Sequence, residues 1–115
     1  MRQVTRNEAQ AAGAKSKRAA LRSSLKHWEY NESKTIEQLK QEAQNPTHGY
    51  LCALCRRYGI GCKRKKRVCP LNRFAKVTEC ATAYHLAKAA YNVGNEEKWK
   101  LYSGELVKIL RGLLK

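Results

Sequence analysis

Hydrophobic residues near the end of the chain recur at helical spacing, and this is the clearest pattern in the sequence. Large apolar residues follow one another at intervals of three or four positions and therefore share one helical face: Trp99, Tyr102, Leu106, Leu110 and Leu113. Asn95, which stands just before this pattern, is a favourable N-cap residue. We therefore predict a helix from about Glu96 to Leu114.

A second helical pattern precedes this one. It begins after Thr78, a candidate N-cap, and one of its faces carries Tyr84, Ala87 and Tyr91. A short turn containing Gly94, a candidate C-terminal cap, separates the two helices. Helices joined by so short a turn usually pack antiparallel. We predict a C-terminal antiparallel helical hairpin over residues 78–114, with these tyrosines against Trp99 and Leu106.

The region before residue 45 shows a weaker alternation of apolar and polar positions. A first helical face is marked by Leu21, Leu25 and Trp28. The polar run 31–33 interrupts the pattern, and Ser33 or Thr35 can then cap a second, shorter helix. Its buried side would carry Ile36, Leu39 and Ala43. Pro46 should terminate this helix, because the residue before a proline is disfavoured in helical conformation. A single long helix through residue 44 is the alternative.

The first twenty residues have no apolar face. They are rich in alanine, glutamine and basic side chains, and Gly13 is their only helix-breaking residue. We predict that residues 1–20 form a basic N-terminal arm, helical or disordered when free. Residues 21–115 should then form a single metal-stabilised helical domain.

Composition leaves this domain short of core material. The 115 residues suffice for one domain, but much of the 43% hydrophobic fraction is alanine, and phenylalanine occurs once. So small a core usually needs an additional constraint such as a bound metal ion. The predicted fold class is mainly α: a small helical protein with an irregular zinc-finger-like cysteine cluster over residues 46–80 and the C-terminal hairpin.

Five cysteines lie in this cluster and are candidate metal ligands: Cys52, Cys55, Cys62, Cys69 and Cys80. The Cys52–Cys55 spacing is that of a zinc knuckle, and four thiolates complete a tetrahedral site. We predict Zn²⁺ bound by four of the five, with Cys52 and Cys55 as members and the other two left open, rather than an iron–sulfur cluster, which uses the same ligands. Buried cysteines without metal are the alternative. His48 is the plausible imidazole substitute, because His27 and His85 fall in predicted helices.

The sequence lacks the features of a secreted or membrane protein. Its first eight residues are polar and have no apolar core of a secretory signal. No apolar run approaches the roughly 18 residues needed to span a bilayer. We therefore expect a cytoplasmic protein without a membrane partner. Reducing surroundings favour metal-bound thiolates over disulfides.

The formal net charge is +15, from 24 Lys and Arg residues against nine Asp and Glu. Such a charge attracts the phosphates of nucleic acids, and we predict DNA or RNA as the partner. The candidate contacts surround the cysteines or lie in the predicted arm: Arg56, Arg57, Lys63, Arg64, Lys65, Lys66, Arg67, Arg73, Lys76, Lys15, Lys17, Arg18 and Arg22. For the run Lys63–Arg67, a solvated surface loop is the alternative. Charge alone predicts no base specificity.

The order of motifs over residues 21–91 is distinctive. It reads Leu-Lys-His27-Trp28-Glu, then Cys-Ala-Leu-Cys, a third cysteine, Cys69-Pro70-Leu71, and a last cysteine before a tyrosine-containing helix. This order resembles that of a group of small bacteriophage proteins of unknown function. In that group the third and fourth cysteines are typically two residues apart, whereas Lys63 to Val68 separate them here. The resemblance implies a phage origin, a location in the host cytoplasm and a shared metal site.

These features favour a non-catalytic zinc-binding phage protein that binds nucleic acid or a nucleoprotein. The alternative is a protein-binding phage factor that inhibits or redirects a host enzyme or defence complex, with Trp99, Tyr102 and Leu106 as its contact face. A metal-dependent nuclease is disfavoured, because cleavage requires carboxylates or histidines that converge on a metal. Residues 46–80 contain one acid, Glu79, and one histidine, His48. We therefore predict that the protein is not an enzyme.

Overall fold

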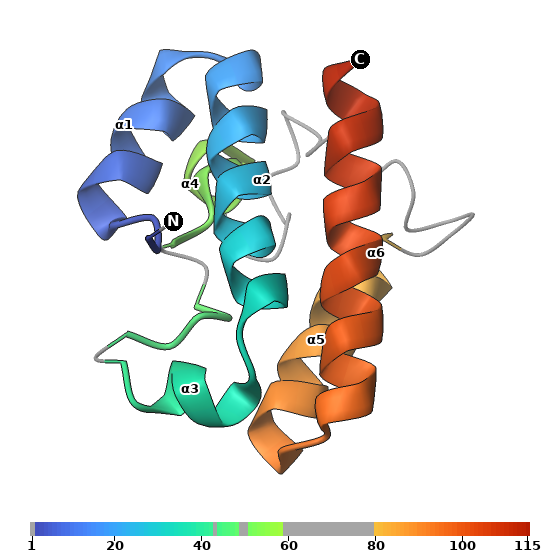
Figure 1. Ribbon diagram of the computed structural model, residues 1–115. Coiled ribbons are helices and arrows are strands. Elements are labelled where there is room, and N and C mark those ends of the chain that lie inside the picture. Colours follow the sequence, from blue (N-terminus) through green and yellow to red (C-terminus); the bar gives the residue numbers. More distant parts are fainter. Residues whose placement is uncertain (1, 43, 49–50, 59–79) are drawn as a thin grey trace.

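The computed structural model describes residues 2–42, 44–48, 51–58 and 80–115, and the regular structure within these ranges is entirely helical. The helices are α1 (Arg6–Lys15), α2 (Lys17–Ser33), α3 (Ile36–Lys40), α4 (Ala53–Tyr58), α5 (Cys80–Val93) and α6 (Glu96–Leu114), arranged as in Figure 1. The predicted mainly α class is confirmed. Most of the predicted cysteine cluster, including its basic run, lies outside the described residues.

The end of α5 and the start of α6 follow from two local signals. Gly94 has a φ of +74°, a left-handed conformation that glycine adopts without steric cost. The side chain of Asn95 accepts a hydrogen bond from the backbone N–H of Lys98 at 3.2 Å and so caps α6. The predicted bounds of α6 are confirmed. No helix in the described ranges, α6 included, is long and apolar enough to cross a membrane.

The first half of the chain forms three helices, so the alternative of one long helix is wrong. Thr35 starts α3 with a capping box: its Oγ1 accepts from the N–H of Gln38, whose Oε1 accepts from the N–H of Thr35. Ile36 and Leu39 are buried, as their spacing predicts. The capping signal is local, and it was readable in the sequence.

Residues 2–15 pack onto the rest of the protein, so the prediction of a separate N-terminal arm is wrong. A capping box between Thr5 and Glu8 begins α1. Val4 and Ala9 are almost completely buried, and Gly13 is buried as well. These small residues let α1 approach both α2 and α4 closely. A helix that packs through small residues shows no stripe of large ones, which explains the error.

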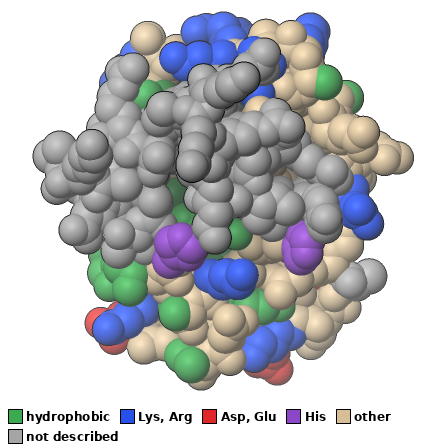
Figure 2. Space-filling view, turned by 180° about the vertical axis from the view of Figure 1, so that it is seen from behind, with side chains coloured by type: hydrophobic (Ala, Val, Ile, Leu, Met, Phe, Trp, Pro, Cys, Tyr) green, Lys and Arg blue, Asp and Glu red, His purple; other side chains and the backbone are tan. Residues whose placement is uncertain are grey.

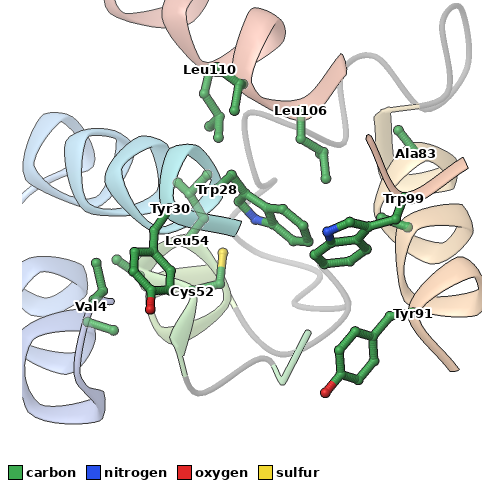
Figure 3. Packing of buried hydrophobic residues seen from close by; sticks show 14 of the residues in the cluster. Val4, Trp28, Tyr30, Cys52, Leu54, Ala83, Tyr91, Trp99, Leu106 and Leu110 are labelled. Carbon is green, nitrogen blue, oxygen red and sulfur yellow. The ribbon is translucent and has the colours of Figure 1, made fainter. Parts of the chain in front are cut away.

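Helix α2 is the central helix of the fold and contacts α1, α4 and α6 (Figure 1). Trp28 of α2 lies 6.0 Å from Trp99 of α6 and 6.1 Å from Tyr84 of α5, measured between ring centroids. Tyr91 lies 5.6 Å from Trp99, as predicted. Tyr84 of α5 is therefore in contact with a ring of α2. The sequence predicted a contact of Tyr84 with the last helix and none with α2. Figure 3 shows Trp28, Trp99 and Tyr91 of this group.

Candidate metal centre and nucleic-acid interface

Cys52 lies just before α4 with 3% of its surface exposed, and Figure 3 shows its sulfur within the hydrophobic cluster. Its Sγ is 3.4 Å from the Oγ of Ser24 in α2. The same Oγ accepts a hydrogen bond from the N–H of Leu54 at 3.2 Å, so the hydroxyl proton of Ser24 can be directed at the sulfur. A donor in this position stabilises a thiolate, and metal-bound cysteines are thiolates. The hydrogen bond from Ser24 would favour a thiolate ligand, whereas the apolar surroundings favour the buried neutral thiol that is the alternative.

The other predicted ligands are placed only in part. Cys55 belongs to α4 and Cys80 is the first residue of α5, while their side chains, together with Cys62 and Cys69, lie outside the described residues. Among the side chains that the structure describes, no three of His, Cys, Asp or Glu converge on a point that could hold a metal ion. The zinc site and its ligand set therefore remain predictions.

The three histidines have different surroundings. His48 is exposed and lines a shallow cavity beside α1, and His85 is exposed on α5. His27 is buried in α2, with 1% of its surface exposed. Its Nδ1 lies 2.8 Å from Oε1 of Gln3, and its Nε2 lies 3.4 Å from Nδ2 of Asn31. Since both ring nitrogens have partners, His27 is a packing residue rather than a metal ligand.

His27 belongs to a buried polar network that the sequence did not reveal. Nε2 of Gln3 donates to Oδ1 of Asn31 at 2.8 Å, and Nδ2 of Asn31 donates to the carbonyl oxygen of Pro46 at 3.1 Å. Because Oε1 of Gln3 can only accept, Nδ1 of His27 carries the proton and Nε2 accepts. Burial lowers the pKa of His27 to about 4, although the nearby carbonyl of Pro46 favours the charged ring. The neutral ring thus holds the N-terminal segment, α2 and the 44–48 segment together.

The predicted basic residues that the structure describes gather where α1 meets α2. Lys15, Lys17, Arg18 and Arg22 are all exposed. Figure 2 shows Lys and Arg side chains at one end of the molecule, the end at which Figure 1 places both the connection between α1 and α2 and the C-terminal end of α6. We call this set of four residues the α1–α2 basic surface.

Helix α4 brings one further basic residue, Arg57, to the end of α1. Nη1 of Arg57 donates to the carbonyl oxygen of Gly13, near the end of α1, at 3.0 Å. Arg56 precedes it in α4, with its side chain outside the described part of the structure. The remaining predicted contacts also lie outside that part: Lys63, Arg64, Lys65, Lys66, Arg67, Arg73 and Lys76. The contact of Arg57 with Gly13 therefore places α4 next to the end of α1, which leads into the α1–α2 basic surface.

The acids on either side of the α1–α2 basic surface are held by other arginines. No Asp or Glu occurs between Glu8 and Glu29 in the sequence. Glu8 forms an ion pair with Arg2 at 2.6 Å, and this hydrogen bond is the main cause that lowers the pKa of Glu8 to about 2. Glu29 pairs with Arg111 at 2.8 Å. These two carboxylates therefore form their ion pairs with arginines outside the α1–α2 basic surface.

The start of α2 carries charges that oppose helix formation. Ser16 caps the helix by accepting from the N–H of Ala19 at 3.0 Å, and the first turn contains no acid. Lys17 and Arg18 occupy that turn instead. The N-terminal end of a helix has a partial positive charge, and cations there are unfavourable by a few tenths of a kcal/mol to about 1 kcal/mol each. Their presence is unfavourable for the helix and favourable for binding an anion.

The apolar face predicted as a protein contact lies largely inside the core. Trp99 and Leu106 have no exposed surface, and Tyr102 is partly buried. That prediction is wrong, because the helical face that it used is the one that packs α6 against α2 and α5. Among the side chains that the structure describes, Leu86, Val93 and Leu101 are large, apolar and exposed.

Comparison with known proteins gives no assignment: no protein-family model, no curated protein and no solved structure matches the chain. The function has to be inferred from the charges, contacts and donor atoms described above.

Proposed function

We propose that the chain is a non-catalytic, zinc-stabilised protein that binds nucleic acid through the α1–α2 basic surface and the basic residues in and after α4. The observation that carries this proposal is the contact of Arg57 with Gly13, which joins two acid-free stretches. Residues 9–28 contain five Lys and Arg residues, and residues 43–78 contain nine. Such a concentration of positive charge releases counterions when phosphates bind, and this favours binding independently of sequence.

The proposed metal site supports this surface from within. Four of the five cysteines would bind Zn²⁺ as thiolates, with Cys52 as one ligand and Ser24 as its hydrogen-bond donor. The ion would fix the segment that carries Lys63–Arg67 next to α4 and so limit its freedom. An iron–sulfur cluster would need the same residues, and elemental analysis of purified protein distinguishes the two metals.

Single Cys→Ser variants test the ligand set. We expect zinc at one equivalent in the parent, its loss in four variants and its retention in the fifth. A parent that contains no metal yet is fully folded would contradict the metal part of the proposal. It would leave nucleic-acid binding to be judged by the next experiment.

Salt-dependent binding tests the nucleic-acid part. The affinity of the full chain for a fluorescent oligonucleotide, as DNA and as RNA, is measured between 50 and 200 mM salt. Replacing Lys15, Lys17 and Arg18 by Gln should weaken binding and make log Kd less steep in log salt, by up to about one slope unit for each phosphate that is no longer bound.

The matched control removes the same charge from other helices. Lys88, Lys98 and Lys108 are exposed residues of α5 and α6, and their replacement by Gln leaves the α1–α2 basic surface intact. We expect a much smaller effect on affinity. Equal losses in both triple variants would indicate attraction to net charge alone, and no binding by the parent at low salt would contradict the proposal.

A protein-binding factor is the second candidate, and exposed apolar residues favour it. Leu86 and Val93 lie two turns apart on the same side of α5, with 39% and 78% of their surfaces exposed. In this proposal the chain is a phage product, in line with the resemblance noted above, that acts on a host enzyme or defence complex in the cytoplasm. Capture of a host protein that survives nuclease treatment and is lost on replacing both residues by Ser would favour this candidate.

We propose the finer features of the fold as well. The zinc-finger-like arrangement of residues 46–80 and the antiparallel hairpin of the two C-terminal helices are parts of the same account. The contact between Tyr91 and Trp99 supports the hairpin.

A further inference from the structure

The exposed side of α1 begins at Lys15, which belongs to the α1–α2 basic surface, and extends along the helix to Arg6. The exposed residues of this helix recur at helical spacing and form one side: Arg6, Asn7, Gln10, Ala11, Ala14 and Lys15. Both ends of this side carry polar or basic groups, and alanines occupy part of the region between them. With ten residues, α1 is about 15 Å long. A chain of phosphates could therefore approach the middle of the helix closely.

A shallow groove lies at the N-terminal end of this side. It has a volume of about 240 Å³ and is lined by Arg6, Gln44, Asn45, His48 and Leu51. A neighbouring hollow shares Arg6 and Gln44 and extends the groove along Thr5, Asn7 and Gln10. Leu51 is almost completely buried, with 2% of its surface exposed, whereas the other four residues are exposed. The groove thus has an apolar floor and a polar rim.

The chemistry of the rim suits a nucleobase. Arg6 and His48 line the groove, and planar side chains of these two types stack on nucleobases. The amides of Gln44 and Asn45 can form hydrogen bonds with the ring edge. Oδ1 of Asn45 already accepts from the N–H and hydroxyl of Thr47, so Nδ2 is the group that remains to donate. No Asp or Glu is among the described residues that line the groove or its extension.

We infer that this groove holds an unpaired base of a single-stranded nucleic acid, whose phosphates follow α1 to Lys15, Lys17 and Arg18. The inference rests on the proposed function and adds to it the form of the ligand. Bases in a duplex are paired and stacked and present no free face to such a groove, whereas a single strand can turn a base out. The protein would therefore prefer single strands, with the basic surface supplying affinity and the groove supplying the preference.

The test compares single-stranded and double-stranded probes. The full chain is titrated with a fluorescent 12-nucleotide strand and with the matching duplex at one salt concentration. A double variant, Gln44→Ala with His48→Ala, removes part of the rim without removing a Lys or Arg. The loss of stacking on one base should weaken single-strand binding by about tenfold. Duplex binding should change by less than twofold.

The matched control is Gln41→Ala with His85→Ala. These residues are an exposed glutamine and an exposed histidine outside the groove, and their replacement should leave both affinities unchanged. The inference is overturned if the groove variant binds the single strand as tightly as the parent does. The proposed function still stands in that case if the variant that lacks Lys15, Lys17 and Arg18 has lost single-strand binding. A parent that binds neither probe would overturn both.

Discussion

The two sides of α2 are held by different interactions. Towards α5 and α6, α2 packs through aromatic rings, with Trp28 in contact with Trp99 and Tyr84. Towards α1 and α4, the buried apolar side chains are smaller, with Val4, Leu51 and Leu54 beside fully buried alanines, and the His27 network adds hydrogen bonds. The first kind of contact derives its stability from the area of large side chains, and the second from close approach and matched hydrogen bonds.

The difference also separates stability from binding. The side with the large aromatic core carries Glu96 and Glu97 at the start of α6 as well as its lysines. The side towards α1 carries the α1–α2 basic surface and α4 with Arg57. The proposed binding region thus lies on the part of the fold where smaller buried side chains contact α2.

The largest expected effect comes from the aromatic side. Replacing Trp99 by Ala should lower the free energy of unfolding by about 3 to 5 kcal/mol, because it leaves a large cavity in the core. Urea denaturation measures this change. Trp99→Phe is the control and should cost less, since the buried Nε1 of Trp99 has no hydrogen-bond partner among the described residues. A loss below 1 kcal/mol for the alanine variant would mean that the aromatic contacts are not the main support of this side.

The next effect concerns the polar network and is set by pH. The pKa of His27 is lowered from 6.5 to about 4 by burial, so the unfolded chain binds the proton more tightly. The free energy of unfolding is therefore not reduced by His27 above pH 6.5. It falls as the pH is lowered towards 4, by about 3 kcal/mol in total, because the unfolded chain takes up the proton first. Urea unfolding at steps between pH 7 and pH 4.5 should show most of this loss.

That window separates His27 from Glu8. The pKa of Glu8 is lowered from 4.5 to about 2, so its contribution is present above pH 4.5 and is lost only below it. Equal stability at pH 7 and pH 4.5 would show that the buried ring is not held neutral.

Close packing between α1 and its neighbours gives a moderate effect. Ala9 has no exposed surface, so Ala9→Leu should lower the free energy of unfolding by about 1 to 3 kcal/mol through overpacking. Ala89 is exposed on α5, and Ala89→Leu is the matched control with an effect within about 0.5 kcal/mol. If both variants are equally stable, α1 is a loosely attached arm, as the sequence alone suggested.

The smallest change in stability should have the opposite sign. Lys17→Glu places a favourable charge in the first turn of α2 and should raise the free energy of unfolding by about 0.3 to 1 kcal/mol. The same substitution should weaken nucleic-acid binding, because it inverts a charge of the basic surface. Lys98→Glu makes the same change in the first turn of α6 and should leave binding nearly unchanged. A Lys17 variant that binds as well as the parent would remove this residue from the interface.

The parts of the fold that the sequence predicted correctly depend on local signals. The start of α6 follows from Gly94 and Asn95, and that of α3 from Thr35 with its partner three residues later. Each of these groups satisfies its hydrogen bonds within one helical turn. The buried positions of α6 follow from the same periodicity, as the burial of Trp99 shows.

The errors come from contacts between distant segments. The packing of α1 depends on Ala9 and Gly13, whose small size gives no hydrophobic pattern. The role of His27 depends on Gln3 and on the carbonyl of Pro46, which no spacing rule connects. Spacing identified the metal ligands only as candidates, because coordination is a long-range arrangement of side chains. The composition predicted the positive charge of the candidate interface. The contact of α4 with α1 could not be predicted from the sequence and is seen only in the fold.

The most direct test of the account is photochemical cross-linking of the full chain to a single strand that carries photoreactive bases, followed by mass spectrometry of the peptides. We predict cross-links in residues 6–22, in residues 44–58 and in the Lys63–Arg67 run, with few in α5 or α6. Cross-links confined to α5 and α6 would contradict the proposal that the side of the fold towards α1 is the one that binds nucleic acid.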